Sequence, residues 1–205
     1  GKSTLIGLIP RFYDVQEGCV KVDGCDVRQY PLETLRRKIG LVPQKALLFK
    51  GTIRENLLWG DENAADDAIY DALKAAQAQE VVDGKPEGLD YEVETGGRNF
   101  SGGQRQRLTI ARALVRKPEV LILDDSASAL DFATDAALRH ALRELPWKPA
   151  VVIISQRTAS IRFADEILVL DDGKLAGRGT HDELLQTCEV YREIYESQFK
   201  KEDAR

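Results

Sequence analysis

The first four residues, Gly1-Lys2-Ser3-Thr4, have the types and the spacing that bind phosphate. A short apolar stretch follows and ends at Pro10, so the sequence predicts a helix over 3–9. A helix N-terminus attracts anions, while Lys2 can reach phosphate oxygens and Ser3 can ligate Mg²⁺. The usual phosphate-binding motif has a further glycine before these residues. That glycine is missing here, so we expect the chain to begin inside the motif. Four residues alone also fit an ordinary polar helix start.

Two acids, Asp124 and Asp125, follow an apolar run over 120–123 that predicts a buried strand. In parallel sheets, ligands bind at the carboxyl ends of the strands. Asp124 is therefore a candidate Mg²⁺ ligand. The alternative is a plain turn, because acids after a strand often form turns.

The segment Ser101-Gly102-Gly103-Gln104 opens a third candidate site. Ser101 is a good N-cap, and the following pattern predicts a helix through Val115. Two glycines at a helix start leave its N–H groups accessible to an anion, whereas a cap alone needs no glycine. We expect the run Arg105–Arg107 to form an exposed helix face with no catalytic role.

The elements that must position these residues alternate between strands and helices, which is the α/β pattern. Four short runs, 39–42, 120–123, 151–154 and 167–170, are almost continuously apolar and favour parallel strands covered on both faces. Turn signals at Val22-Asp23-Gly24 and Asp171-Asp172-Gly173 predict two antiparallel hairpins.

Helical periodicity predicts further helices over 63–82 and 130–145. Thr180 with Glu183 forms a capping-box pattern for a C-terminal helix. The charged tail, 200–205, is expected to fray.

The span 52–116 is mostly helical and lies between strands. We therefore predict that it is a helical subdomain inserted into an α/β core formed by 1–51 and 117–205. Trp59 is expected in the core of this subdomain, although contact with a partner helix is an alternative.

Composition sets limits on function. The chain has 205 residues, of which 43% are hydrophobic and 31% charged, which suits one large globular domain. The net charge of -5 argues against nucleic-acid binding by bulk electrostatics. Cys19, Cys25 and Cys188 form no CxxC pair, so a disulfide framework or zinc site is not expected and a reducing compartment is. We expect no signal peptide and no membrane span within this sequence, so another segment or chain must do any membrane work.

Five segments together resemble one family, the ABC transporters, and they occur in that family's order. Phe100-Ser101-Gly102-Gly103-Gln104 resembles the signature motif, and Gly1–Thr4 resembles the end of the P-loop. The other three are similar to the Walker B motif with the D-loop (121–131), the Q-loop (40–44) and the switch region (153–157). The segment 48–57 also resembles the exporter branch, in which this stretch receives the coupling helices of a transmembrane domain.

The resemblance implies a P-loop NTPase core with a parallel sheet, antiparallel β hairpins and an inserted helical subdomain. It also implies two domains that face each other head to tail around two ATP molecules. The residues expected to serve this chain's own ATP and Mg²⁺ are Gly1, Lys2, Ser3, Thr4, Gln44 and Asp124, of which Ser3, Gln44 and Asp124 are the implied metal ligands. The residues expected to serve the partner's γ-phosphate are Ser101, Gly102, Gly103 and Gln104. The D-loop, Ser128 to Asp131, is expected to lie along the interface between the two domains.

Two departures from the family pattern lie at the positions nearest the chemistry. The acid after Asp124 is usually Glu and here is Asp125, whose carboxylate falls back by about 1.5 Å. The switch residue is usually His and here is Gln156, which cannot become cationic. Gln44, Asp125 and Gln156 are thus candidate catalytic residues of a weakened site. The signature is intact, so we predict one half of a heterodimeric exporter whose different partner chain carries the Glu and the His.

This interpretation places the protein at the cytoplasmic face of a bacterial plasma membrane, with no nucleic-acid partner. Three alternatives remain: a homodimeric exporter that tolerates Asp125 and Gln156, a cytosolic ABC ATPase that acts on ribosomes or DNA, and a nucleotide-gated structural subunit without catalysis.

Overall fold

The computed structural model describes residues 1–126 and 128–202, with side chains described as far as Gln198. The chain divides into two compact units. The larger comprises 5–154, and the smaller comprises 1–4 with the chain from Ser155 onward. Each unit is described by itself below.

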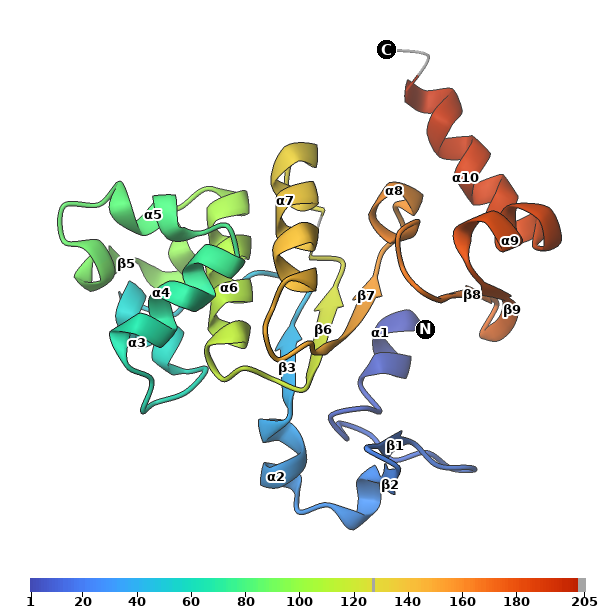
Figure 1. Cartoon of the computed structure of the whole chain (residues 1–205), viewed down its shortest axis with the longest axis horizontal. Helices are drawn as coiled ribbons and strands as arrows, with labels where there is room; N and C mark the ends of the chain where they lie inside the picture. Colours follow the sequence, from blue (N-terminus) through green and yellow to red (C-terminus); the bar gives the residue numbers. More distant parts are fainter. Residues whose placement is uncertain (127, 203–205) are drawn as a thin grey trace. The chain divides into compact units, whose positions relative to one another are not determined.

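The described chain contains helices and strands interspersed along its length (Figure 1). The helices are α1 (Lys2–Ile6), α2 (Leu32–Arg37), α3 (Ile53–Leu58), α4 (Asp66–Ala75), α5 (Gln79–Asp83), α6 (Gly102–Val115), α7 (Phe132–Arg143), α8 (Thr158–Ile161), α9 (His181–Thr187) and α10 (Glu189–Glu202). The strands are β1 (Lys21–Val22), β2 (Cys25–Asp26), β3 (Ile39–Val42), β4 (Gly51–Thr52), β5 (Glu92–Val93), β6 (Val120–Asp124), β7 (Ala150–Ile154), β8 (Ile167–Asp171) and β9 (Lys174–Gly179).

A parallel sheet in the order β3-β6-β7 forms the centre of the larger unit (Figure 1). Its register pairs Ile39 with Val120 and Leu121 with Val151. The central strand β6 buries Leu121, Ile122 and Leu123 on both faces of the sheet. Because all three strands run the same way, they end at one edge, as the apolar runs predicted.

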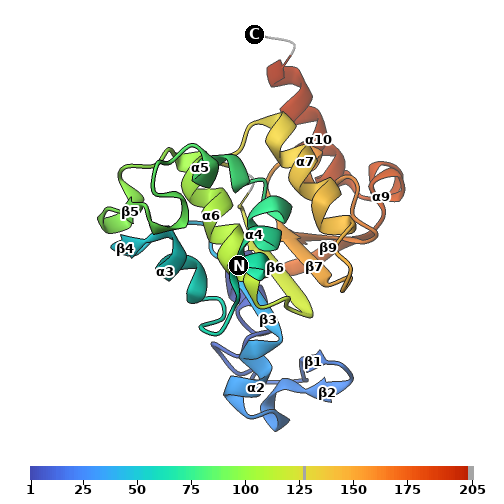
Figure 2. The ribbon, with the colours of Figure 1, turned by 60° about the vertical axis from the view of Figure 1, so that its left-hand side comes forward.

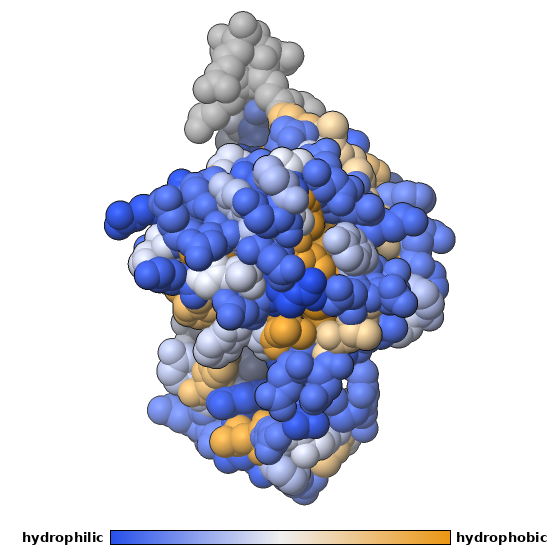
Figure 3. Space-filling view, turned by 90° about the vertical axis from the view of Figure 1, so that its left-hand side faces the viewer, coloured by the Kyte–Doolittle hydropathy of each residue, from blue (hydrophilic) through white to orange (hydrophobic). Residues whose placement is uncertain are grey.

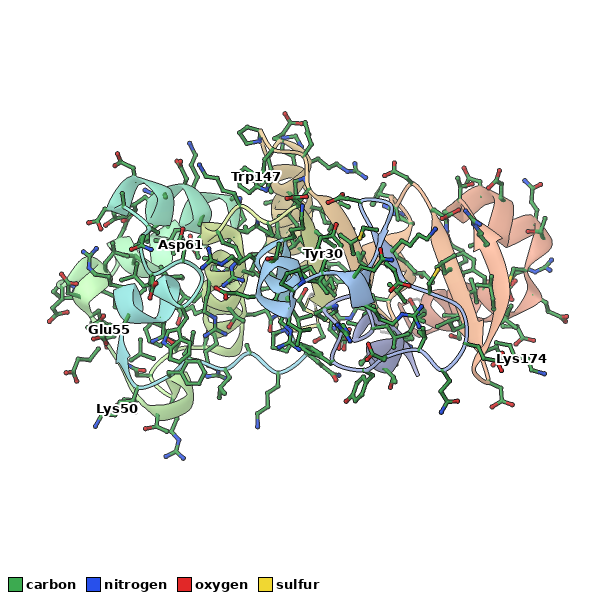
Figure 4. The ribbon with its side chains drawn as sticks, turned by 90° about the horizontal axis from the view of Figure 1, so that it is seen from below. Tyr30, Lys50, Glu55, Asp61, Trp147 and Lys174 are labelled. Atoms are coloured by element: carbon green, nitrogen blue, oxygen red, sulfur yellow. The ribbon has the colours of Figure 1, made fainter. Side chains whose placement is uncertain are left out.

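Both predicted hairpins are present. Asp23 and Gly24 join β1 to β2 with φ of 50° and 75°, and Asp172 and Gly173 join β8 to β9 with φ of 42° and 76°. Two consecutive left-handed residues match the twist of a two-residue hairpin. In the first hairpin, the Tyr30 hydroxyl donates to the carbonyl of Val22 at 3.0 Å (Figure 4).

The prediction that 167–170 is a buried parallel strand is wrong. Among the described residues, β8 pairs antiparallel with β9, and Leu168 is 53% exposed. Burial alternates along β8, since only Ile167 and Val169 face the small core shared with α9 and α10. An apolar residue on the solvent face made the run look covered on both sides.

Helices α3, α4, α5 and α6 gather at one side of the larger unit (Figure 2). Their buried side chains form one core with residues of β3 and β6, so the helical region and the sheet share a hydrophobic interior. The α/β fold with antiparallel hairpins and an inserted helical region is therefore present, while the boundaries 52–116 remain a prediction.

The helix predicted over 63–82 is two helices. Gln77 has a φ of 56°, its N–H bonds to the carbonyl of Lys74 at 3.1 Å, and the Ala78 N–H bonds to that of Leu73 at 2.8 Å. This pattern is a Schellman motif, which ends a helix. It was missed because its left-handed position carries glutamine and not glycine.

The structure corrects three further predictions. Helix α1 ends at Ile6, before Gly7, and the next residues form turns. Helix α10 continues to Glu202, while the rest of the predicted tail lies outside the described residues. Trp59 is not in the core, because it is 67% exposed.

The run Arg105–Arg107 is not an exposed face either. Gln106 is buried, and Arg105 donates to the carbonyls of Gly97 (3.3 Å) and Phe100 (2.6 Å). Arg107 forms an ion pair with Glu80 at 2.8 Å. The run therefore ties α6 to the loop before it and to α5, because α6 is the central helix of its region.

Candidate functional site

The carboxyl edge of the parallel sheet brings two predicted site residues together. Gln44 follows β3, and Asp125 follows β6, the neighbouring strand. The Gln44 amide Nε2 lies 3.5 Å from Asp125 Oδ2. Residues 81 positions apart thus meet where ligands bind in open α/β sheets.

The backbone at Asp125 is held in an unusual conformation. Its φ is 48°, in the left-handed region that non-glycine residues seldom adopt. Its N–H donates to the carbonyl of Ile154 at 2.8 Å, and its carbonyl accepts from the N–H (3.2 Å) and hydroxyl (2.8 Å) of Ser128. Such strain persists only where surrounding bonds fix it, and it concentrates at functional sites.

Asp124 ends β6 and is half-buried. Its carboxylate and the amide oxygen of Gln44, both in the larger unit, are oxygen donors of the kind Mg²⁺ prefers, and so is the hydroxyl of Ser3 in the smaller unit. The donor chemistry therefore fits the implied metal. Among residues 1–126 and 128–202, no group of three His, Cys, Asp or Glu side chains forms a metal site.

The predicted phosphate-binding residues Gly1 to Thr4 lie at the start of a helix, as expected, because α1 begins at Lys2. The side chains of Lys2, Ser3 and Thr4 are exposed. Their roles toward ATP stay predictions.

The predicted signature segment is the N-terminus of α6. Ser101 is its N-cap: its hydroxyl oxygen accepts the N–H of Gln104 at 3.2 Å, while Gln104 Oε1 accepts the N–H of Ser101 at 2.9 Å. This capping box leaves the Ser101 hydroxyl proton available to donate to an anion. The first helical N–H groups, at Gly102 and Gly103, have no partner within the helix.

The two glycines differ in what the fold demands of them. A Cβ on Gly103 would lie 3.3 Å from the carbonyl oxygen of Ala129, so the D-loop explains that glycine. A Cβ on Gly102 would meet only the end of Arg105, at 4.0 Å, and Gly102 is exposed. Since folding does not require glycine at 102, the close approach of something from outside is the remaining physical reason for it.

The D-loop leads from β6 into α7. Asp131 caps α7, and its carboxylate accepts from the N–H (2.9 Å) and the hydroxyl (2.8 Å) of Thr134. These hydrogen bonds lower the pKa of Asp131 below its usual value. Leu130 is buried in the main core, so the end of the loop is firmly anchored.

Gln156 belongs to the smaller unit, in the loop before α8. Its side chain is exposed, whereas the next-but-one residue, Thr158, is buried. The backbone of this loop is bonded to α10: Gln198 Nε2 donates to the carbonyl of Gln156 at 2.6 Å.

A second feature of the larger unit was missed from the sequence: a groove of about 300 Å³ lined by aromatic and cationic side chains. Phe49 and Trp59 stack with ring centroids 5.1 Å apart, and both are exposed. The space-filling view shows a mainly hydrophilic face with small hydrophobic patches (Figure 3). Exposed aromatic pairs beside a groove are typical of docking sites.

Three arginines, Arg36, Arg112 and Arg116, line the same groove. Arg36 and Arg116 donate to backbone carbonyls, including those of Pro10 (3.1 Å) and Gly60 (2.7 Å). Arg112 lies over the Phe49 ring at 5.6 Å, and its buried Nη1 has no hydrogen-bond partner in the described part of the chain. Burial lowers the pKa of Arg112 below its usual value. None of the three forms an ion pair with a carboxylate of the described residues, so the groove carries uncompensated positive charge.

Asn56 was also missed, and it shapes the segment beside the groove. Its buried amide accepts from the N–H of Phe49 (2.8 Å) and donates to the carbonyls of Phe49 (2.8 Å) and Thr52 (2.9 Å). Thr52 and Glu55 form the capping box of α3; Glu55 is labelled in Figure 4. These bonds hold Phe49 at the surface.

No helix among the described residues is long and apolar enough to cross a bilayer.

Comparison with known proteins gives a consistent result. Residues 1–128 match the family model described as ABC transporter. A Bacillus subtilis protein named as an uncharacterized ABC transporter ATP-binding protein, YfiB, is 50% identical over 98% of this chain and 35% of its own length. An ATP-dependent lipid A-core flippase of Haemophilus ducreyi is 42% identical over 98% of this chain and 35% of its own length. The chain thus spans about a third of the length of the curated relatives it matches.

A solved structure, that of a bacterial Atm1-family ABC exporter with ATP bound, superimposes with a TM-score of 0.92 at 37% identity. The match covers 97% of this chain and 35% of that one.

Proposed function

The chain belongs to the ABC transporter family, of which it is an ATP-binding domain, and from that premise we propose that it powers an exporter as one of two such domains that close around ATP. Lys2, Ser3 and Thr4 bind this chain's own ATP, and Mg²⁺, when bound, neutralises phosphate charge beside Asp124. The lipid A-core flippase and the ATP-bound exporter among its relatives support the exporter assignment.

The observation that carries the proposal is the fixed backbone of Asp125. Its N–H and carbonyl are both bonded, to Ile154 and Ser128, so the backbone cannot advance to compensate for the short side chain. A nucleophilic water misplaced by about 1 Å reacts on the order of a hundredfold more slowly. With Gln156 unable to carry charge, this site holds ATP and hydrolyses it slowly.

The signature of the same chain is suited to a faster site. Ser101 has a hydroxyl proton to donate, Gly102 leaves open space, and the N-terminus of α6 attracts negative charge. These groups, with Gly103 and Gln104, complete an active site on the partner's P-loop. The partner is a different chain that carries the usual Glu and His.

The aromatic and cationic groove supports a second partner, a transmembrane segment. Phe49 and Trp59 offer exposed apolar area, and three arginines that form no ion pair among the described residues line the groove. We assign the groove to a coupling helix that brings apolar side chains and a carboxylate. The closure of the two domains around ATP is then transmitted through this helix to the membrane. This domain lies at the cytoplasmic face.

ATP turnover of the full-length protein with its natural partner tests the asymmetry. We expect Asp125→Asn to change total turnover by less than about twofold, because the slow site contributes little. Replacement of the partner's glutamate at the corresponding position by glutamine is expected to abolish turnover. If Asp125→Asn abolishes turnover, the site is not degenerate. If full-length protein hydrolyses ATP rapidly with no second kind of chain, the protein is a homodimeric exporter.

A further inference from the structure

The amide of Gln198 in α10 is bonded to the loop that carries Gln156. Its Oε1 accepts from both the N–H and the hydroxyl of Thr158, each at 2.9 Å. Its Nε2 donates to the carbonyl of Gln156 at 2.6 Å. We infer that Gln198 is a positioning residue, which fixes the backbone from which the Gln156 side chain reaches the nucleotide.

The hydrogen-bonding pattern demands an amide at position 198. A backbone N–H only donates, so the oxygen must face Thr158, and a carbonyl only accepts, so the nitrogen must face Gln156. Glutamate would place a second acceptor against the Gln156 carbonyl. Leucine would offer no bond to either group.

Within the loop, the Ser155 hydroxyl accepts the N–H of Arg157 at 2.9 Å, but it does not reach Thr158. Helix α8 is one turn long, and its N-cap, Arg157, makes no side-chain capping bond. Thr158 is 2% exposed, so water does not replace Gln198 as partner of its N–H and hydroxyl. Gln198, 40 residues away in the sequence, supplies that cap.

The helix that carries Gln198 is itself anchored in the smaller unit. Tyr191 and Cys188 are buried with Ile167 and Val169 of β8, and the Tyr191 hydroxyl lies 2.8 Å from Nδ1 of His181. Helix α10 is thus anchored in this small core at one part and bonded to the loop through Gln198, so it holds the loop in place. A displacement of α10 moves the loop of Gln156, so α10 affects how this site holds ATP.

The inference rests on the proposed role of Gln156, so its test separates loop position from nucleotide binding. In the full-length protein, Gln198→Ala is expected to speed hydrogen exchange at the Thr158 amide at least about fivefold, because that N–H loses its acceptor. The control is Gln186→Ala on α9, an exposed glutamine with no hydrogen-bond partner among the described residues, which should leave this exchange unchanged. Unchanged exchange in Gln198→Ala overturns the inference.

The second measurement is the release of labelled ATP from this chain's own site, taken as the difference from a Lys2→Ala variant. We expect Gln198→Ala to speed release severalfold and to have no further effect in a Gln156→Ala background, because it acts through that residue. An equal effect in both backgrounds overturns the positioning role. If Gln156→Ala alone does not change release while Thr158 exchange still rises in Gln198→Ala, the bond to the loop stands and the proposed role of Gln156 fails.

Discussion

At the scale of single residues, Gly102 is a position where the fold does not require glycine but the proposed function does. A Cβ there meets nothing closer than 4.0 Å, and the residue lies in the first turn of α6. In a helix, alanine is favoured over glycine by about 0.5–1 kcal/mol. The fold therefore accepts alanine at this position.

We predict that Gly102→Ala folds normally and lowers ATP turnover of the assembled pair on the order of 10- to 100-fold, because the methyl group holds the partner's phosphates away from the N–H groups of α6. Turnover and thermal midpoint are measured together on the full-length complex. Normal turnover in Gly102→Ala would mean that the signature N-terminus does not approach the nucleotide. The comparison variant is Gly103→Ala, which meets the Ala129 carbonyl and should lower the midpoint as well.

At the scale of elements, local rules in the sequence predicted most of the sheet and both hairpins. Apolar runs located β3, β6 and β7 within a residue, and Asp-Gly turns located the hairpins, because period and turn chemistry depend on near neighbours. The exposure of one face of β8 and the groove at Trp59 depend on distant packing, which one sequence does not show. Likewise, the bond between Gln198 and Thr158 joins residues 40 positions apart.

The candidate site divides in the same way. The P-loop, the acids after β6 and the signature could be predicted, because each motif is continuous in the sequence. The left-handed backbone of Asp125 could not, because a hydrogen bond to the distant Ile154 helps to fix it. The amide network of Asn56 is local, but no sequence motif indicates it.

The break between α4 and α5 gives a prediction at this scale. Gln77 is left-handed, which costs a non-glycine residue about 1 kcal/mol. We predict that Gln77→Gly stabilises the last turn of α4 by up to about 1 kcal/mol and slows amide exchange at Gln77 and Ala78 up to about fivefold. Gln79→Gly is the matched control: this exposed residue begins α5, so glycine there should speed exchange. Faster exchange in Gln77→Gly would show that the lost bond from its side chain to Lys74 outweighs the backbone term.

At the scale of the whole molecule, the groove matters because it combines exposed aromatic side chains with arginines that form no ion pair among the described residues. Trp59 is 67% exposed, and Nη1 of Arg112 is buried without a partner among the described residues. A buried, unbonded guanidinium nitrogen is costly for a domain on its own. That nitrogen is closed to solvent, so the part of the groove open to a docking segment is the exposed pair Phe49 and Trp59.

We predict that Trp59→Ala weakens docking of the transmembrane segment by on the order of 2 kcal/mol, which is roughly thirtyfold, because a tryptophan at the centre of an interface contributes most of its binding energy. The substitution leaves the isolated fold intact, since the side chain is mainly in solvent. Hydrogen exchange at amides 57–60 of the full-length protein measures docking, and it should become faster in Trp59→Ala and in Arg112→Gln. Phe163→Ala, an exposed aromatic of the smaller unit, is the control and should leave these amides unchanged. Equal protection of 57–60 in all variants would mean that this groove is free in the assembled protein, and that the membrane segment docks on another surface.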